Sequence, residues 1–337
     1  MKNQLKYKIK LSGHEKDDLL HTLIRSLNGD PCAMLMKFLY SHPHSNNDPV
    51  RGAELWAKSL ARPHYYVPSN EKTLISQKIN RLVNKIDMSP VTLVDFGPGS
   101  QAAVKTKTYP VLRAAKNIRE YIGFDICESY ANESAEAVKS AFPKVFTRSV
   151  VGDFNKPTSL IKPEPSLALL FGCTSGNFAE KPGYIRPDNT IEHLIAIGNN
   201  LKSGSHLIIT QDTNQNEADL HRAYSSPISA RFRLNVMHRI VRDLKPIGFN
   251  PQLFRYEGEW NDCDKYYGGY AVATEAQIFF LDGERHTIQA GQKICLFRSY
   301  KFAAETFQTI ARHAGFEPVD MQLDHEGKIA MHLLRKV

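Results

Sequence analysis

The stretch VTLVDFGPGS, Val91–Ser100, decides the fold of this chain. An apolar, β-branched run is followed directly by a glycine-containing turn, a pattern typical of a buried strand that leads into a helix. More apolar runs that predict strands follow at Tyr121–Ile126, Arg148–Phe154, Ser166–Gly172 and Ser205–Asp212. Helical patterns separate them, at residues 109–118, 130–141 and 190–201. Alternation of this kind favours a doubly wound α/β fold with a parallel sheet.

The chain on either side of this alternating core follows other patterns. Apolar residues recur at helical spacing within Asp17–Tyr40, and further helices are expected at Ala53–Leu60 and Ser69–Lys85. After Asp212, two helical segments precede runs typical of antiparallel strands, and the chain closes with a helix at Phe302–His313 and a hairpin. A terminal antiparallel hairpin beside a parallel sheet is typical of a class I methyltransferase.

These patterns predict two lobes. Residues 71–213 together with 300–337 are expected to form a class I, Rossmann-like α/β domain, in which a seven-stranded sheet ends in that hairpin and binds the cofactor. Residues 1–70 and 214–299 are expected to join in a smaller, discontinuous substrate-binding lobe over the carboxyl ends of the strands. The reason is the break in strand–helix alternation after Asp212.

Composition sets limits on the class of protein. The 337 residues are 42% hydrophobic and 23% charged, which is ordinary for a globular protein, and no apolar run is long enough for a membrane span. The polar N-terminus lacks the apolar segment of a secretory signal, so we expect a cytoplasmic protein with no membrane partner. The five cysteines are scattered without a CxxC pair, which predicts neither disulfides nor a metal site.

The net charge of +8 leaves alternatives open. A basic surface suits a methyltransferase that acts on RNA or on a protein terminus. However, the lysines and arginines are spread along the whole chain without a dense cluster, which is more typical of a solvated surface. We therefore expect a small-molecule substrate rather than nucleic acid. A non-catalytic, cofactor-binding partner protein is the remaining alternative, and the sequence predicts no oligomeric state.

The expected strand ends carry residues suited to a nucleoside cofactor, because ligands of open α/β sheets bind at the carboxyl ends of the strands. The glycines of Gly97–Gly99 let the backbone approach the ligand, and the helix expected after Ser100 favours an anionic group. Asp125 can accept both ribose hydroxyls. Asp153 and Phe154 can bind the adenine amino group and cover its ring.

The same residues argue against a nicotinamide cofactor. The glycine turn lacks the full GxGxxG, since Ala102 stands where the last small residue falls. Asp125 also lies further downstream than the usual ~20 residues of a nicotinamide fold. The terminal antiparallel hairpin points the same way, and it is this architecture more than the glycines that makes S-adenosylmethionine the expected cofactor.

A family resemblance spans roughly residues 48–316. It is carried by the segments GAELW, PHYYVPSNEKTLI, LLFGCTSGNF, AYSS, ARFRLNVM, GEWN and GQKICLFRSYKF. The chain resembles the histidine Nα-methyltransferases, which make histidine betaine on the way to ergothioneine. That family also includes the fungal dimethylallyltryptophan N-methyltransferases of ergot alkaloid synthesis. The resemblance implies N-methylation of the α-amine of an amino acid or an amino-acid-derived molecule.

The resemblance also implies a substrate site. Asn177 matches the asparagine that holds the amino-acid substrate, and Tyr224 matches a tyrosine that hydrogen-bonds its carboxylate. Tyr65 matches the first tyrosine of a Tyr-Tyr-Pro segment that faces the substrate, and Ser299 of the last strand is retained. Asp212, at the end of the fifth strand, and Tyr65 are candidates to orient the amine. With Asn177 they are the candidate catalytic residues, and neither is assigned as a general base.

Departures from the family pattern predict a substrate other than histidine. In histidine-specific members a glutamate pairs with the imidazole, and Phe297 occupies that position here. Gly269 replaces a bulky residue of the pocket wall and is expected to leave space, so an apolar or aromatic side chain is favoured. An N-terminal tyrosine of the family has no match, since Ser45–Gly52 stands in its place. Arg298 either faces outward or turns inward to select an acidic group, and alternation along the strand favours the outward position.

Overall fold

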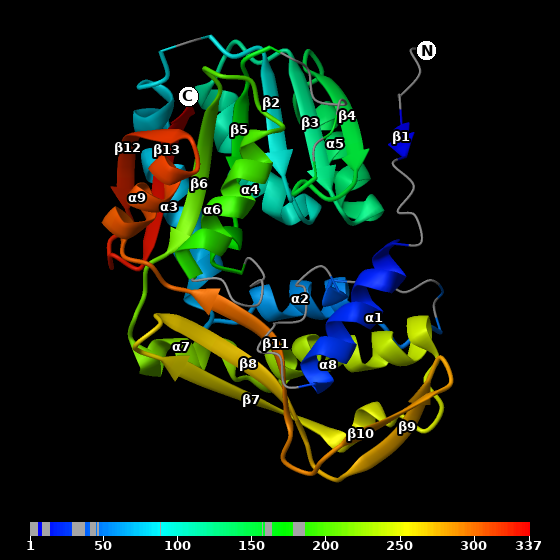
Figure 1. Cartoon of the computed structure of the whole chain (residues 1–337). Helices are drawn as coiled ribbons and strands as arrows, with labels where there is room; N and C mark the ends of the chain where they lie inside the picture. Colours follow the sequence, from blue (N-terminus) through cyan, green and yellow to red (C-terminus); the bar gives the residue numbers. More distant parts are fainter. Residues whose placement is uncertain are drawn as a thin grey trace.

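The computed structural model describes residues 6–8, 14–28, 38–40, 45, 47–87, 89–156, 158, 164–177 and 186–337. A mixed sheet with helices on both faces forms the larger part, and a smaller lobe lies against one end of it (Figure 1). None of the described helices combines the length and the apolar character that crossing a membrane requires.

The large sheet has the strand order β1-β4-β3-β2-β5-β6-β13-β12. All pairings from β1 to β6 are parallel, and β13 and β12 close the sheet antiparallel. This is the class I methyltransferase arrangement that the sequence predicts. The bounds are β1 Lys6–Lys8, β2 Thr92–Phe96, β3 Glu120–Asp125, β4 Phe146–Val151, β5 Leu167–Leu170, β6 His206–Asp212, β12 Phe316–Leu323 and β13 Ile329–Lys336.

The seven predicted strands are present, and one short edge strand, β1, extends the sheet. β1 pairs with residues Ser149–Val151 of β4, so these three residues belong to the large sheet and not to the lobe predicted for residues 1–70. They alternate lysine with tyrosine and offer too few apolar residues for a strand pattern.

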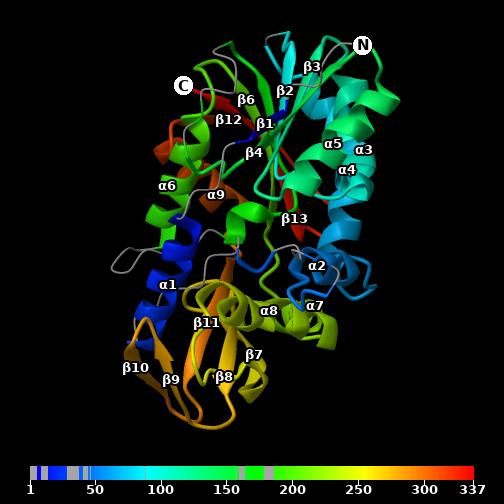
Figure 2. The same ribbon diagram turned by 90° about the vertical axis from the view of Figure 1, so that its right-hand side faces the viewer.

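Helices cover both faces of the sheet (Figure 2). Alternate residues of each strand point to opposite faces, so Leu93 of β2 packs in one apolar core and its neighbour Val94 in the other. On the first face lie α3 Tyr66–Val83, α4 Gln101–Ala114 and α5 Glu128–Ala141, and on the second lie α6 Arg186–Gly198 and α9 Ala304–His313.

The helix predicted at residues 109–118 begins eight residues earlier, as α4. The side chain of Ser100 accepts a hydrogen bond from the backbone N–H of Ala103 at 3.4 Å, which caps the helix start. Pro110 then lies inside the helix. The prediction missed the first turns because the segment Gln101–Thr108 is mostly polar.

The smaller lobe lies beyond the carboxyl ends of the parallel strands (Figure 1). It contains the antiparallel sheet β11-β8-β7 and the hairpin of β9 and β10. The bounds are α1 His14–Leu27, α2 Gly52–Leu60, α7 Glu217–Tyr224, α8 Pro227–Leu244, β7 Phe254–Asn261, β8 Tyr266–Ala273, β9 Gln277–Leu281, β10 Glu284–Ile288 and β11 Lys293–Tyr300. Residues 29–37, part of the helical pattern predicted within Asp17–Tyr40, lie outside the described residues.

Candidate active site

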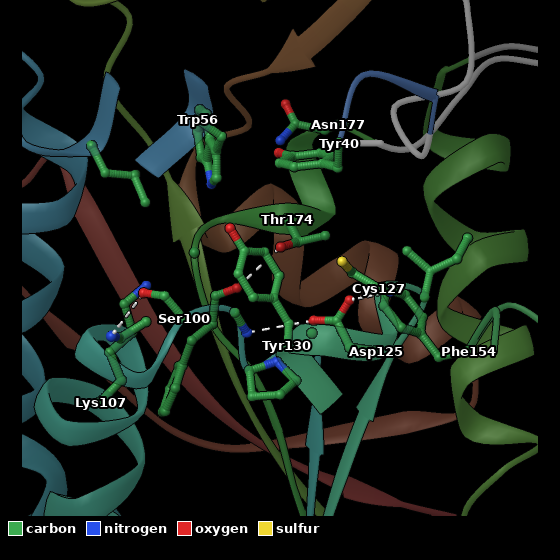
Figure 3. A pocket seen from close by; sticks show the side chains of 18 of the residues that line it. Tyr40, Trp56, Ser100, Lys107, Asp125, Cys127, Tyr130, Phe154, Thr174 and Asn177 are labelled. Atoms are coloured by element: carbon green, nitrogen blue, oxygen red, sulfur yellow. Dashed lines mark hydrogen bonds between the residues drawn. The ribbon is translucent and has the colours of Figure 1, made fainter. Parts of the chain in front are cut away.

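A cavity of about 320 Å³ lies at the carboxyl ends of the parallel strands. All the residues predicted to bind the cofactor line it: Gly97, Gly99, Ser100, Asp125, Asp153 and Phe154. Tyr65 and Asn177, predicted to face the substrate, line it too. In Figure 3, Asn177, Tyr40 and Trp56 lie at one end of this cavity, and Asp125 and Phe154 lie toward the other.

The glycine turn after β2 has a backbone that L side chains rarely adopt. Gly97 has φ +67° and Gly99 has φ +69°. The N–H of Gly97 donates to the carbonyl of Phe124 on β3 at 2.8 Å, which fixes the turn beside the next strand. The cavity wall is therefore bare backbone at this point, which allows a ligand to approach closely.

Asp125 lies at the end of β3, and backbone groups hold its carboxylate. The N–H of Cys127 donates to Oδ1 at 2.8 Å, and that of Gly99 donates to Oδ2 at 3.4 Å. Burial raises the pKa of Asp125 to about 7, although these N–H donors oppose the shift. Such a carboxylate is suited to accept hydrogen bonds from two neighbouring ribose hydroxyls.

The turn after β4 supplies the next wall of the cavity. Oδ1 of Asp153 accepts from both the backbone N–H and the side-chain amide of Asn155, each at 3.0 Å. The ring of Phe154 packs edge-on against Phe96 at 5.7 Å between centroids. His193 of α6 lies 2.8 Å from Oδ1 of Asn155, and both line the cavity, although the sequence did not single them out. A flat aromatic base fits against this wall.

A buried ion pair that the sequence analysis missed lies on the other side of the glycine turn. Nζ of Lys107 lies 2.5 Å from Oε2 of Glu71, and both residues line the cavity. Oε1 of Glu71 accepts from the N–H of Gly172 at the end of β5 and from the hydroxyl of Thr210 on β6. Glu71 therefore joins α3 to α4 and to two strand ends. The only signal in the sequence was an acid among the apolar positions of a helix.

The turn after β5 places Asn177. It forms a short 3₁₀ helix, η2 Thr174–Asn177, which packs against β11. A Cβ on Gly176 would lie 2.7 Å from the carbonyl oxygen of Tyr300, so only glycine permits this close approach. Packing against β11 therefore requires the glycine that directly precedes Asn177.

Aromatic side chains form the substrate end of the cavity. Ring centroids are 5.6 Å apart between Tyr40 and Trp56, 5.9 Å between Trp56 and Tyr65, and 5.7 Å between Tyr65 and Tyr224. Tyr224 lies behind Tyr65 and does not itself line the cavity. The sequence showed no match for the family's N-terminal tyrosine, because Ser45–Gly52 stands in its place. Tyr40, shortly before that segment, lines the cavity, so the N-terminal part of the chain does bring a tyrosine to the site.

Asp212 lies outside the cavity lining, in a buried network. Its carboxylate accepts from Nζ of Lys301 at 2.6 Å and from the hydroxyl of Tyr66 at 2.7 Å. Lys301 also donates to the hydroxyl of Tyr224 at 2.9 Å and to Ser299 at 3.0 Å. Asp212 was predicted to orient the substrate amine; in the structure its carboxylate contacts Lys301, Tyr66 and, at 3.5 Å, the hydroxyl of Tyr224, and it does not line the cavity.

The expectation that Gly269 leaves open space is wrong. A Cβ on Gly269 would collide with the ring of Phe297, which therefore occupies the volume that the glycine leaves. Phe297, Ser299 and Lys301 alternate onto one face of β11 and its continuation. Arg298 lies on the other face, where its guanidinium carbon is 4.7 Å from the ring centroid of Tyr266, so it does not turn onto the face that Phe297 occupies.

Comparison with known proteins gives a consistent result. The family described as histidine-specific methyltransferase, SAM-dependent, matches residues 18–336. The histidine N-alpha-methyltransferase of Mycobacterium tuberculosis (strain CDC 1551 / Oshkosh) is 23% identical over 98% of this chain and 100% of its own length. The N-methyltransferase imqF of Aspergillus flavus is 25% identical over 92% of this chain and 83% of its own. Among solved structures, an S-adenosylmethionine-dependent methyltransferase from Clostridium acetobutylicum ATCC 824 has a TM-score of 0.42 at 12% identity, covering 80% of this chain and 91% of its own.

Proposed function

The chain belongs to the family of histidine-specific, S-adenosylmethionine-dependent methyltransferases, and we propose that it methylates the α-amine of an amino acid or amino-acid derivative other than histidine. One observation carries the proposal: Asn177 and Tyr65 face the same cavity as the glycine turn and Asp125. An amine held by the first pair lies within reach of a nucleoside cofactor held by the second.

The residues present fit S-adenosylmethionine. The bare glycine turn, the buried carboxylate of Asp125 and the ring of Phe154 can bind its methionine part, its ribose and its adenine, respectively. The helix that begins after Ser100 favours its carboxylate. When bound, this cofactor supplies an electrophilic methyl group.

The chain's own contribution is positioning. Methyl transfer is an in-line displacement, and alignment of the two reactants supplies most of the acceleration. Burial raises the pKa of Tyr65 and of Tyr224 well above the usual range. Both hydroxyls therefore stay neutral and serve as hydrogen-bond partners, not as bases. The amine loses its proton to solvent before it attacks.

The residue at the position of the family glutamate argues against histidine. Phe297 is buried behind Tyr224, does not itself line the cavity and cannot accept a hydrogen bond from an imidazole N–H. An imidazole that depends on that glutamate would lose its partner, which costs a few kcal/mol and removes about two orders of magnitude in kcat/KM. A cytoplasmic location belongs to the same proposal and is supported by the composition.

The test is a mass-spectrometric screen of amino acids, larger amino-acid derivatives and simple amines with the methyl donor. We expect an Nα-methylated product, with histidine about a hundredfold below the best substrate in kcat/KM. Asn177→Ala should lower kcat/KM by about tenfold or more and leave S-adenosylhomocysteine affinity nearly unchanged. Methylation of RNA or protein termini alone would contradict the proposal, as would histidine as the best substrate.

A further inference from the structure

Arg233 of α8 is a buried cation in the smaller lobe. Only 4% of its surface is exposed. Its guanidinium carbon lies over the rings of Phe297 at 4.4 Å, Tyr224 at 5.2 Å and Tyr256 at 5.8 Å, measured to the centroids. Aromatic faces attract such a cation, but they cannot accept hydrogen bonds in the plane of the guanidinium.

No counter-charge accompanies Arg233 among the residues that the structure describes. One of its terminal nitrogens donates to the carbonyl of Ser229, one turn earlier in its own helix, at 3.1 Å. Its Nε is buried and has no hydrogen-bond partner there. A buried charge without a carboxylate is costly, so its retention calls for an anionic partner that the described chain does not supply.

Two neighbours point to the same missing partner. The hydroxyl of Tyr256, on the strand beside Arg233, is also buried without a hydrogen-bond partner in the described part of the chain. Arg62 donates to the hydroxyl of Ser229 at 3.1 Å. Arg233 donates to the carbonyl of the same residue, so two positive charges lie close together. Burial and the charge of Arg233 both lower the pKa of Arg62. Orphaned donors beside like charges form a site for an anion.

The cluster adjoins the substrate end of the cavity. The ring of Tyr224 lies between the two regions: Arg233 is 5.2 Å from its centroid, and the ring of Tyr65 meets it edge-on at 5.7 Å between centroids. Arg233 does not itself line the cavity and lies behind the ring of Tyr224. A substrate side chain that extends past Tyr65 and Tyr224, away from the cofactor end, would therefore approach Arg233.

We propose that Arg233, with the hydroxyl of Tyr256, binds an acidic group on the side chain of the substrate. The inference rests on the proposed function, since it names the class of amino acid that the site accepts. The acid-selecting arginine is thus not Arg298 on β11 but a residue of α8 that reaches the same strand from the opposite face. A carboxylate would accept hydrogen bonds from the edge of the guanidinium, while the aromatic rings that pack against its face keep the guanidinium in place.

The test compares acids with their amides in the full-length protein. The pairs are glutamate with glutamine, and 4-carboxyphenylalanine with 4-carbamoylphenylalanine. We expect kcat/KM to favour the better acid over its amide by about tenfold or more, and Arg233→Met to abolish that preference. Arg233→Lys should keep part of it, because the charge remains without the planar fork. Arg231→Met is the matched control, since Arg231 lies two residues away on the exposed face of α8.

A second measurement does not depend on turnover. Glutarate has no amine, and we expect it to raise the melting temperature of the S-adenosylhomocysteine-loaded wild type and Arg231→Met but not of Arg233→Met. Methylation without any preference for acids would overturn the inference and leave the proposed function standing. Arg233-dependent stabilisation by glutarate without methylation of any amine would support the anion site and overturn the proposed function. Neither methylation nor stabilisation would overturn both.

Discussion

The two ends of the cavity are built by different means. At the cofactor end, backbone turns and acids stand directly after parallel strands, as Gly97, Asp125 and Asp153 do. At the substrate end, aromatic rings and buried charges come from segments far apart in the sequence, such as Tyr40, Tyr224 and Arg233. The first end depends on the local path of the backbone, and the second depends on packing between elements. A substrate pocket of this kind can change its chemistry without altering the cofactor cradle.

The largest effect is expected at the buried network of the substrate end. Lys301 and Asp212 are 1% and 2% exposed and pair at 2.6 Å. Lys301→Met leaves the carboxylate of Asp212 buried without its cation, which should lower the free energy of unfolding by about 4 kcal/mol in urea denaturation. The double variant Lys301→Met/Asp212→Leu should recover part of that loss, because the orphaned charge is gone.

Lys293, the first residue of the strand that directly precedes Lys301, supplies the control. It forms ion pairs with Glu257 and Glu259 at an exposed position. Lys293→Met should therefore cost less than about 1 kcal/mol. If Lys301→Met and Lys293→Met lowered the free energy of unfolding by similar amounts, the buried ion pair with Asp212 would not stabilise the substrate end more than an exposed ion pair does.

A smaller effect is expected where Phe297 fills the space over Gly269. Gly269→Ala places a methyl group against the Phe297 ring and should lower the free energy of unfolding by about 2 kcal/mol, because the packed core cannot absorb it. Adding Phe297→Leu should restore most of the loss, since the smaller side chain leaves room for the methyl. A Gly269→Ala variant as stable as the wild type would show that the ring moves aside, and that the pocket is larger than its packing indicates.

The same contrast explains what the sequence could predict. The parallel sheet, its terminal hairpin and the six cofactor-end residues follow from local patterns, because the strand ends of a parallel sheet meet at one edge. Lys107 and Glu71 escaped notice because their pairing depends on how α3 packs against α4. Gly269 was misread because the ring that fills its space comes from the neighbouring strand. Contacts between two residues far apart in the sequence leave no local pattern, so a single sequence does not predict them.

The smallest effect concerns the pH dependence of the cofactor end. Burial raises the pKa of Asp125 to about 7, so near neutral pH the carboxyl of the free protein is partly protonated. Only the carboxylate accepts hydrogen bonds from both ribose hydroxyls. Affinity for S-adenosylhomocysteine should therefore rise about tenfold between pH 6 and pH 8 and then level off, as measured by calorimetry.

Asp125→Asn separates this effect from other titrations. It keeps the shape of the side chain but cannot ionise, so its affinity should be lower and flat across the same range. Stability should change in the opposite sense. A carboxyl whose pKa is raised on folding contributes stability that is present below about pH 4 and is lost as the pH rises through about 7. Burial also raises the pKa of Asp95, to about 6, so Asp95 adds its own decrease in the free energy of unfolding as the pH rises. Subtracting the pH profile of Asp125→Asn from that of the wild type leaves the contribution of Asp125. If the affinity for S-adenosylhomocysteine varied with pH in the same way in both proteins, Asp125 would not belong to the cofactor site.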